Sequence, residues 1–177
     1  KPAEFISALE AIRSSQPAPN TIRRVILRVS EESGDTTTIS ILDARELFSL
    51  LGVAPPLGLV ETVTAPPQLF AHQVAGHTRL AIGLTVRNSA RARQSLLDWE
   101  PTLQRDLEAL FLGEFPLLQN EPYRDISYRN IDLRYLALDP ANDLGIGYLY
   151  FPAENLILIA TSEQTLHEII NRLFESR

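Results

Sequence analysis

Several residue types that carry chemistry are missing or scarce in this sequence. It contains no cysteine and no methionine, and Lys1 is its only lysine. The lack of cysteine excludes disulfide bonds, thiolate metal ligands and thiol catalysis. The lack of any internal lysine excludes a Ser-x-x-Lys nucleophile pair. Composition alone therefore removes several common kinds of reactive centre.

Positive charge and long apolar runs are scarce as well. The chain has 16 Lys and Arg against 22 Asp and Glu, a net charge of −6. We therefore expect no nucleic-acid partner, because phosphate contacts require a clustered basic face. No apolar run approaches the roughly 18 residues that a transmembrane helix needs. With 177 residues, of which 45% are hydrophobic, the chain suits a single globular domain spanning 1–177.

The start of the sequence is informative because it is Lys1-Pro2, with no initiator methionine. We expect the sequence to be a processed or excised part of a longer protein. A signal peptide or a membrane anchor can precede Lys1.

Hydrophobic periodicity predicts an N-terminal helix followed by three strand–strand–helix units. The helix spans 2–15, and the units span 21–52, 68–112 and 123–176. In the first unit, two strands over Thr21–Ser30 and Thr36–Leu42 surround turn residues 31–35. The helix that follows begins with a capping box, in which Asp43 and Glu46 satisfy each other's backbone amides.

The second unit has strands over Leu69–Ala75 and Leu80–Arg87, followed by a helix that begins near Asn88 or Ser89. Pro101 predicts one long helix with a kink, or two helices in tandem.

The third unit is longer and ends in a helix that Thr161 is predicted to cap. Its strands are expected over Arg124–Tyr128, Ile131–Leu138, Leu144–Phe151 and Asn155–Thr161. Residues 156–160 are apolar at every position, which favours a central strand that is covered on both faces. The whole pattern predicts an α+β fold, with an antiparallel sheet of about seven or eight strands and helices packed mainly on one face.

Two histidines, His72 and His77, are the first candidates for a metal site, since they flank a predicted hairpin turn. Zinc needs a third ligand, for which Glu61 or Glu100 would have to lie nearby. The simpler interpretation is two polar residues beside a turn, and no zinc motif is present. A hydrolase that uses His72 or His77 is a further alternative, but there is no Gly-x-Ser-x-Gly elbow. We predict no catalytic residues, no metal ligands and no cofactor.

Two clusters are candidates for contact with a partner. Arg87, Arg91 and Arg93 can dock an acidic partner or a lipid head group, or can form a solvated face. Five tyrosines lie in the C-terminal strands, and they form an amphipathic protein-binding patch if several share an open sheet face. They are Tyr123, Tyr128, Tyr135, Tyr148 and Tyr150.

Three segments carry distinctive motifs: Leu80–Leu112 with its Trp-Glu pair, Tyr128–Tyr135 with Asn-Ile-Asp-Leu-Arg-Tyr, and Leu158–Leu166 with Ile-Ala-Thr-Ser-Glu. Together they resemble an uncharacterised family of envelope-anchored domains from ultra-small bacteria of the candidate phyla radiation (Patescibacteria). The resemblance covers most of the chain, from about Phe5 onward. It implies an extracytoplasmic domain tethered by an N-terminal transmembrane helix and a Pro-rich linker, and it supplies no catalytic residue.

We therefore expect a non-enzymatic domain of the cell envelope that binds a protein partner or belongs to a surface assembly. Membrane association would come only through the missing anchor. The alternative is a carrier of a small molecule or lipid, with an apolar cavity between the sheet and the helices.

Overall fold

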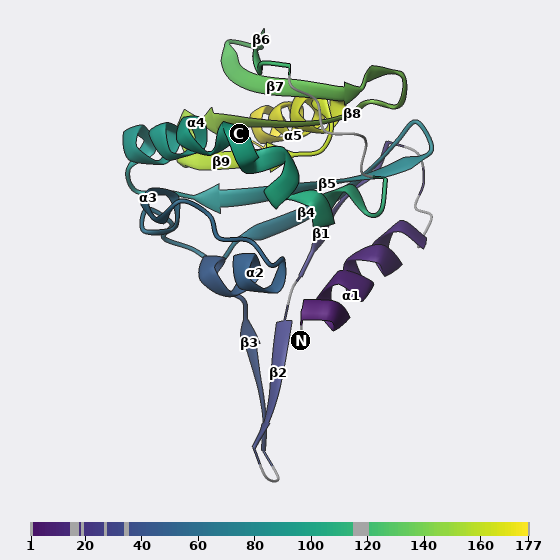
Figure 1. The fold of residues 1–177 in the computed structure, drawn as a ribbon, viewed down its shortest axis with the longest axis vertical. Helices are drawn as coiled ribbons and strands as arrows, with labels where there is room; N and C mark the ends of the chain where they lie inside the picture. Colours follow the sequence, from purple (N-terminus) through teal and green to yellow (C-terminus); the bar gives the residue numbers. More distant parts are fainter. Residues whose placement is uncertain are drawn as a thin grey trace.

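A seven-stranded antiparallel sheet forms the centre of the molecule (Figure 1). The structure, a computed structural model, describes residues 2–14, 18, 20–26, 28–33, 36–114 and 121–176. In spatial order the strands are β1 (Ile22–Val25), β4 (Gln68–Val74), β5 (His77–Thr85), β9 (Leu156–Ala160), β8 (Leu144–Phe151), β7 (Ile131–Asp139) and β6 (Arg124–Tyr128). The predicted α+β class is confirmed. Strand β9 lies in the middle and all its residues are buried, as its apolar sequence predicted.

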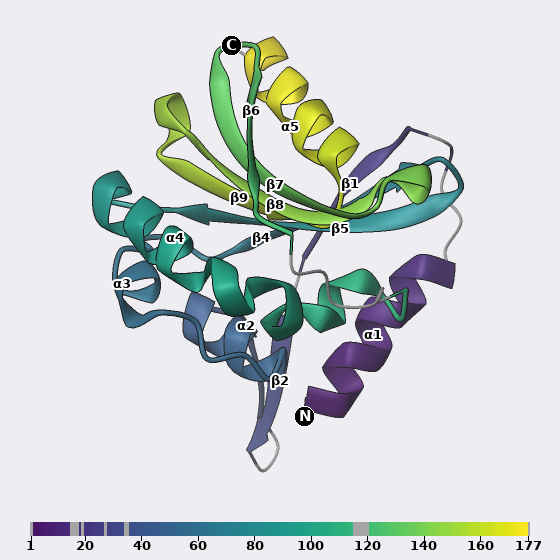
Figure 2. The ribbon, with the colours of Figure 1, turned by 45° about the horizontal axis from the view of Figure 1, so that its top comes forward.

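Helices cover both faces of this sheet. They are α1 (Pro2–Ser14), α2 (Ala44–Leu50), α3 (Leu57–Val60), α4 (Ser89–Asp106) and α5 (Glu163–Glu175). Among the described residues, short 3₁₀ turns accompany them: η1 (Glu108–Phe111), η2 (Pro140–Asn142) and η3 (Pro152–Glu154). Figure 2 shows α4 and α5 on opposite sides of the sheet. No helix in the described part of the chain is both long enough and apolar enough to cross a membrane.

The structure does not show the one-sided helix packing that the sequence predicted. Alternation along β9 sends Ile157 and Ile159 into the core beneath α4. It sends Leu158 and Ala160 into a second core, against Leu166 of α5. Because both faces of the central strand are apolar, each needs a covering layer. Helix α5 supplies the second layer.

The predicted first strand, Thr21–Ser30, is divided between two sheets. Its first part is β1, which pairs with β4 at one edge of the main sheet. Its second part enters β2 (Arg28–Ser33), which pairs only with β3 (Thr36–Ile41) in a hairpin that projects from the body (Figure 1). Gly34 and Asp35 of the predicted turn, and Ser15 of the predicted helix, lie outside the described residues.

Helix α2 begins at the capping side chains that the sequence predicted, but the predicted cap of the last helix is wrong. The Asp43–Glu46 capping box is present at α2, and α4 is one helix that continues through Pro101. Helix α5 is capped by Ser162 instead of Thr161. The hydroxyl of Thr161 is already engaged across the sheet, where it accepts a hydrogen bond of 3.2 Å from the amide of Leu80.

Candidate functional site

The outer strand β6 presents a free edge. It is joined to β7 by the two-residue turn Arg129-Asn130, whose φ angles are 51° and 63°. Two successive positive φ angles define a type I′ turn, which makes Tyr128 and Ile131 a hydrogen-bonded pair. This pair determines which residues of β6 direct their backbone amides and carbonyls toward β7.

Hydrogen-bonded and non-hydrogen-bonded pairs alternate along an antiparallel ladder. Counting back from Tyr128 in steps of two, Ile126 and Arg124 also direct their backbone amides and carbonyls toward β7. The backbone amides and carbonyls of Asp125 and Ser127 therefore point away from β7. No strand in the described part of the chain pairs with this outer side. Asp125 and Ser127 thus offer backbone donors and acceptors that pair with no described strand.

A groove of about 390 Å³ lies between β6 and α4, above the outer strands. Its walls are Arg93, Leu96 and Leu97 of α4 and Asp125, Ile126 and Ser127 of β6, and its floor comes from β7 and β8. Arg93 and Asp132 are exposed, and neither has a partner among the described residues. Beside apolar surface, the groove therefore offers a positive and a negative side chain that pair with no described residue.

One carboxylate holds the groove floor to α4. Glu100 accepts from Nε and Nη2 of Arg134 at 2.5 and 3.0 Å, and from the hydroxyl of Tyr148 at 2.7 Å. Nη1 of Arg134 donates to Asp125 of β6 at 2.7 Å. The guanidinium group thus bridges α4, β7 and β6. Glu100 is therefore engaged with protein groups and does not join the histidines in a zinc site.

Burial and charge shift the pKa values of the groups in this cluster. Burial, reinforced by the nearby Glu100 carboxylate, raises the pKa of Tyr148 far above its ordinary value. The hydrogen bond to Glu100 raises the pKa of Arg134. Tyr148 is therefore held as a neutral hydrogen-bond donor and Arg134 as a permanent cation, which suits a fixed scaffold.

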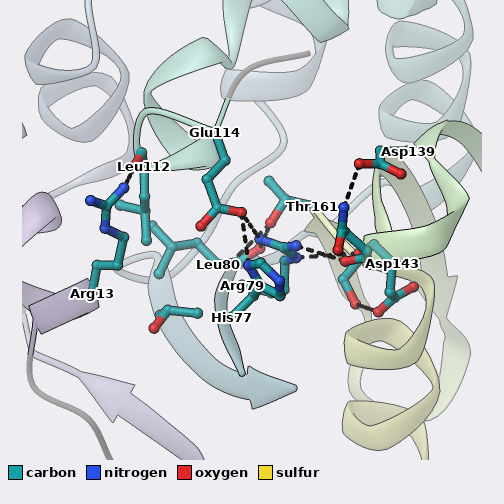
Figure 3. A network of polar contacts seen from close by, with 12 residues as sticks. Arg13, His77, Arg79, Leu80, Leu112, Glu114, Asp139, Asp143 and Thr161 are labelled. Carbon is teal, nitrogen blue, oxygen red and sulfur yellow. Dashed lines mark hydrogen bonds and ion pairs between the residues drawn. The ribbon is translucent and has the colours of Figure 1, made fainter. Parts of the chain in front are cut away.

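A second polar network surrounds Arg79 of β5 (Figure 3). Arg79 is 1% exposed, and its guanidinium donates to the carboxylate of Glu114 at 2.8 Å. It also donates to the backbone carbonyls of Asn142 and Asp143, at 2.7 and 3.3 Å. Two of these three hydrogen bonds therefore go to main-chain carbonyls, which join β5 to the η2 turn.

His77 lies in the same network. Its Nδ1 is 3.2 Å from Oε2 of Glu114, which also binds Arg79. Burial alone would raise the pKa of Glu114, but the hydrogen bond and charge of Arg79, helped by His77, outweigh it and lower that pKa. The carboxylate is thus held in its charged form.

His72 belongs to a different contact chain, so the two histidines do not share a site. Its Nδ1 lies 3.0 Å from the hydroxyl of Thr165, which donates to the hydroxyl of Ser162 at 3.0 Å. Ser162 in turn donates to the carboxylate of Asp143. Burial lowers the pKa of His72, which favours the neutral ring. Both residues are fully buried, and the Ser162 hydroxyl caps α5 by accepting from the backbone amide of Thr165, so the two hydroxyls are placed as packing groups rather than as accessible nucleophiles.

The remaining candidates for metal or anion binding are engaged elsewhere or isolated. Glu61 pairs with Arg91 at 2.5 Å and accepts from Arg87 through its backbone carbonyl at 2.9 Å. Of the predicted basic cluster, only Arg93 reaches the groove. Within the described residues, no three histidine, aspartate or glutamate side chains are grouped as metal ligands would be.

The five tyrosines do not form one patch. Tyr148 and Tyr150 lie on the α4 side, where the ring of Tyr123 contacts that of Tyr148 at a centroid distance of 6.2 Å. Tyr128 and Tyr135 lie on the α5 side. The physical reason is strand parity, because adjacent residues in β7 and β8 alternate between the two covered faces.

Two of the tyrosines show how the α5 side is filled. The ring of Tyr135 crosses Gly145 and Gly147 of β8, where any added Cβ would collide with it. Tyr128 stacks on His167 of α5 at a centroid distance of 3.9 Å. These aromatic groups therefore contribute to packing between the sheet and α5 rather than to an open binding face.

The sequence did not reveal the central roles of Arg79, Glu100 and Arg134. Their partners lie 34 or more residues away for the principal contacts, so no local spacing relates them. Neither the protein-family models, nor the curated proteins, nor the solved structures include a match to this chain.

Proposed function

We propose that this domain is a non-enzymatic protein-interaction module that binds an extended segment of a partner along the outer edge of β6. The observation that carries the proposal is the outward direction of the backbone groups of Asp125 and Ser127. An extended chain laid antiparallel to β6 would complete the ladder, and such strand addition is a common mode of peptide recognition.

The groove supports the same proposal. It lies on the α4 side of β6, next to Ser127, whose small side chain leaves room for a longer one to cross. Side chains of an added strand alternate between faces, so every second one points toward this side. The free charge of Arg93 favours an acidic side chain there.

Selection from a library of linear peptides tests this function. Peptides selected on the wild-type domain are compared for binding to Ser127→Pro and Ser127→Ala. Proline removes the outward amide of Ser127 but leaves the inward ladder to β7 intact, whereas alanine keeps that amide. The proposal predicts that binding survives alanine and falls at least tenfold with proline. Selected peptides that bind both variants equally would contradict it.

The location of the module is part of the proposal. An extracytoplasmic position in the cell envelope, tethered through a preceding membrane anchor, is supported by the family resemblance of the sequence. Fractionation of cells that express the full-length protein tests it. Recovery in the membrane fraction, with the domain accessible to external protease, is the expected result. Recovery in the soluble cytoplasmic fraction would overturn it.

A second candidate, small-molecule binding, is favoured by the same groove. Its volume of about 390 Å³ falls within the range of ligand pockets, and it lies between sheet and helix. Because its lining mixes free charges with apolar surface, it suits a polar ligand better than a lipid. Native mass spectrometry distinguishes the two candidates, since a carrier would retain extra mass that is lost on denaturation.

A further inference from the structure

We infer that the strand added to β6 comes from a second copy of this chain, in a two-fold β6–β6′ pairing centred on Ile126. The inference rests on the proposed function of the β6 edge and names its partner. Three observations carry it: the direction of the backbone groups, the order of side chains along β6, and the contrast with the other edge of the sheet.

The backbone geometry selects the register. A two-fold axis at Ile126 places Asp125 opposite Ser127′ and Ser127 opposite Asp125′. These are the two residues whose amides and carbonyls point outward, so the pairing would form four hydrogen bonds between the copies. A two-fold axis at Asp125 or at Ser127 would bring residues outside β6 into the ladder and shorten the strand overlap.

The side chains are self-complementary in this register. Arg124 would lie opposite Tyr128′, where a guanidinium can stack on an aromatic ring. Asp125 would lie opposite Ser127′, whose hydroxyl can donate to the carboxylate. Ile126, which is partly buried against the α5-side core, would meet its own copy. No like charges face each other. An axis at Asp125 would instead oppose two carboxylates, which is unfavourable across a strand pair.

The other edge of the sheet, strand β1, is unfavourable for pairing with its own copy. Strand β1 has the sequence Ile-Arg-Arg-Val, and full antiparallel pairing with its own copy would place Arg23 opposite Arg24′. Facing cations oppose such pairing, and charged residues are a recognised protection of edge strands. Self-association is therefore directed to β6, and the result would be one continuous sheet across the two-fold axis.

Self-association is tested by the molar mass of the purified chain as its concentration is raised. We expect the mass to rise from 19.8 kDa toward twice that value. Ser127→Pro should remain at the monomer mass, while Ser127→Ala should follow the wild type. A chain that stays monomeric up to millimolar concentration would overturn the inference. So would a dimer that forms equally well in Ser127→Pro.

Cysteine cross-linking tests the register, because the chain contains no cysteine of its own. In the inferred pairing Ile126 faces its copy in a non-hydrogen-bonded pair, with a Cα separation of about 4.5 Å. That separation lies within the range that a disulfide bridges. Ile126→Cys should therefore give disulfide-linked dimer under mild oxidation at least tenfold faster than Ser127→Cys, which faces Asp125′. Equal rates for the two variants would contradict the register.

The experiments distinguish a failure of the β6 edge as the binding site from a failure of the second copy as its partner. If the chain is monomeric but binds selected peptides only when the Ser127 amide is present, the second copy is wrong and the edge remains the binding site. If peptide binding ignores the Ser127 amide and the chain is also monomeric, both are wrong.

Discussion

Arg134 and Glu100 form a bidentate pair that fastens strand β7 to helix α4, with Nε and Nη2 donating to the two carboxylate oxygens. The side chains of Arg134 and Glu100 are 28% and 16% exposed, so the pair is only partly screened by water. The hydroxyl of Tyr148 shares the same carboxylate. Glu100 is therefore the acceptor on which the floor of the groove depends.

Glu100→Ala should lower the free energy of unfolding by about 2 kcal/mol, because it leaves Nε and Nη2 of Arg134 and the buried hydroxyl of Tyr148 without their acceptor, although Nη1 of Arg134 keeps Asp125. Glu108→Ala is the matched control. It removes the same charge from an exposed residue that has no partner among the described residues, and its effect should stay within about 0.5 kcal/mol. Urea denaturation of both variants measures the difference. Equal midpoints would show that the cluster does not stabilise the fold.

In the Arg79 network, replacing Arg79 should destabilise the fold more than replacing its ion-pair partner Glu114. Arg79 is 1% exposed and serves two backbone carbonyls, so Arg79→Met should cost about 3 kcal/mol. The Glu114 side chain is 27% exposed, and solvent screening should hold the cost of Glu114→Gln to about 1 kcal/mol or less. Thermal and urea unfolding compare them. A larger loss for Glu114→Gln would mean that the ion pair, and not the main-chain contacts, is the anchor.

His72 makes stability depend on pH in the weakly acidic range. Burial lowers the pKa of His72 in the folded state, whereas the unfolded chain binds a proton with a pKa of about 6.5. Its contribution to stability is therefore complete above pH 6.5 or so and is lost as pH falls through the folded pKa. In His72→Asn, the free energy of unfolding should vary less between about pH 7 and pH 5. An unchanged slope would show that His72 is not the responsible group. His167, whose pKa burial also lowers, should account for a remaining slope.

Three tyrosines should resist ionisation at alkaline pH. Burial raises the pKa of Tyr123, Tyr135 and Tyr148 well above that of free tyrosine, which is about 10. Because the folded pKa values are the higher ones, stability is intact below about pH 10 and falls as pH rises above it. Ultraviolet absorbance of tyrosinate should show these three ionising only together with unfolding. Ionisation of all five tyrosines in one step, with the fold intact, would contradict the burial of these three side chains.

Local sequence patterns predicted much of the fold because their causes are local. The Asp43–Glu46 capping box, the apolar run of β9 and the strands of the second and third units each depend on residues close together in the chain. The division of Thr21–Ser30 between two sheets could not be predicted, since both parts have the same strand pattern. What separates them is the pairing of β1 with β4, more than 40 residues later.

The site was harder to predict than the fold for a similar reason. The five tyrosines are conspicuous in the sequence, yet strand parity distributes them between two cores. Conversely, Asp125 and Ser127 are ordinary residues. Their importance comes from the turn at Arg129-Asn130, which sets the hydrogen-bonding phase of β6. A turn of that type can be suspected from sequence, but whether β6 lies at an edge depends on the strand order of the whole sheet.

The most direct test of the free edge is residue-resolved amide exchange along β6. In the dilute domain, the amides of Asp125 and Ser127 should exchange rapidly, while those of Ile126 and Tyr128, which face β7, should be protected. At high protein concentration, or with a selected peptide added, Asp125 and Ser127 should become protected by at least tenfold. If their exchange is unchanged under both conditions, no strand is added to β6 and the account is wrong.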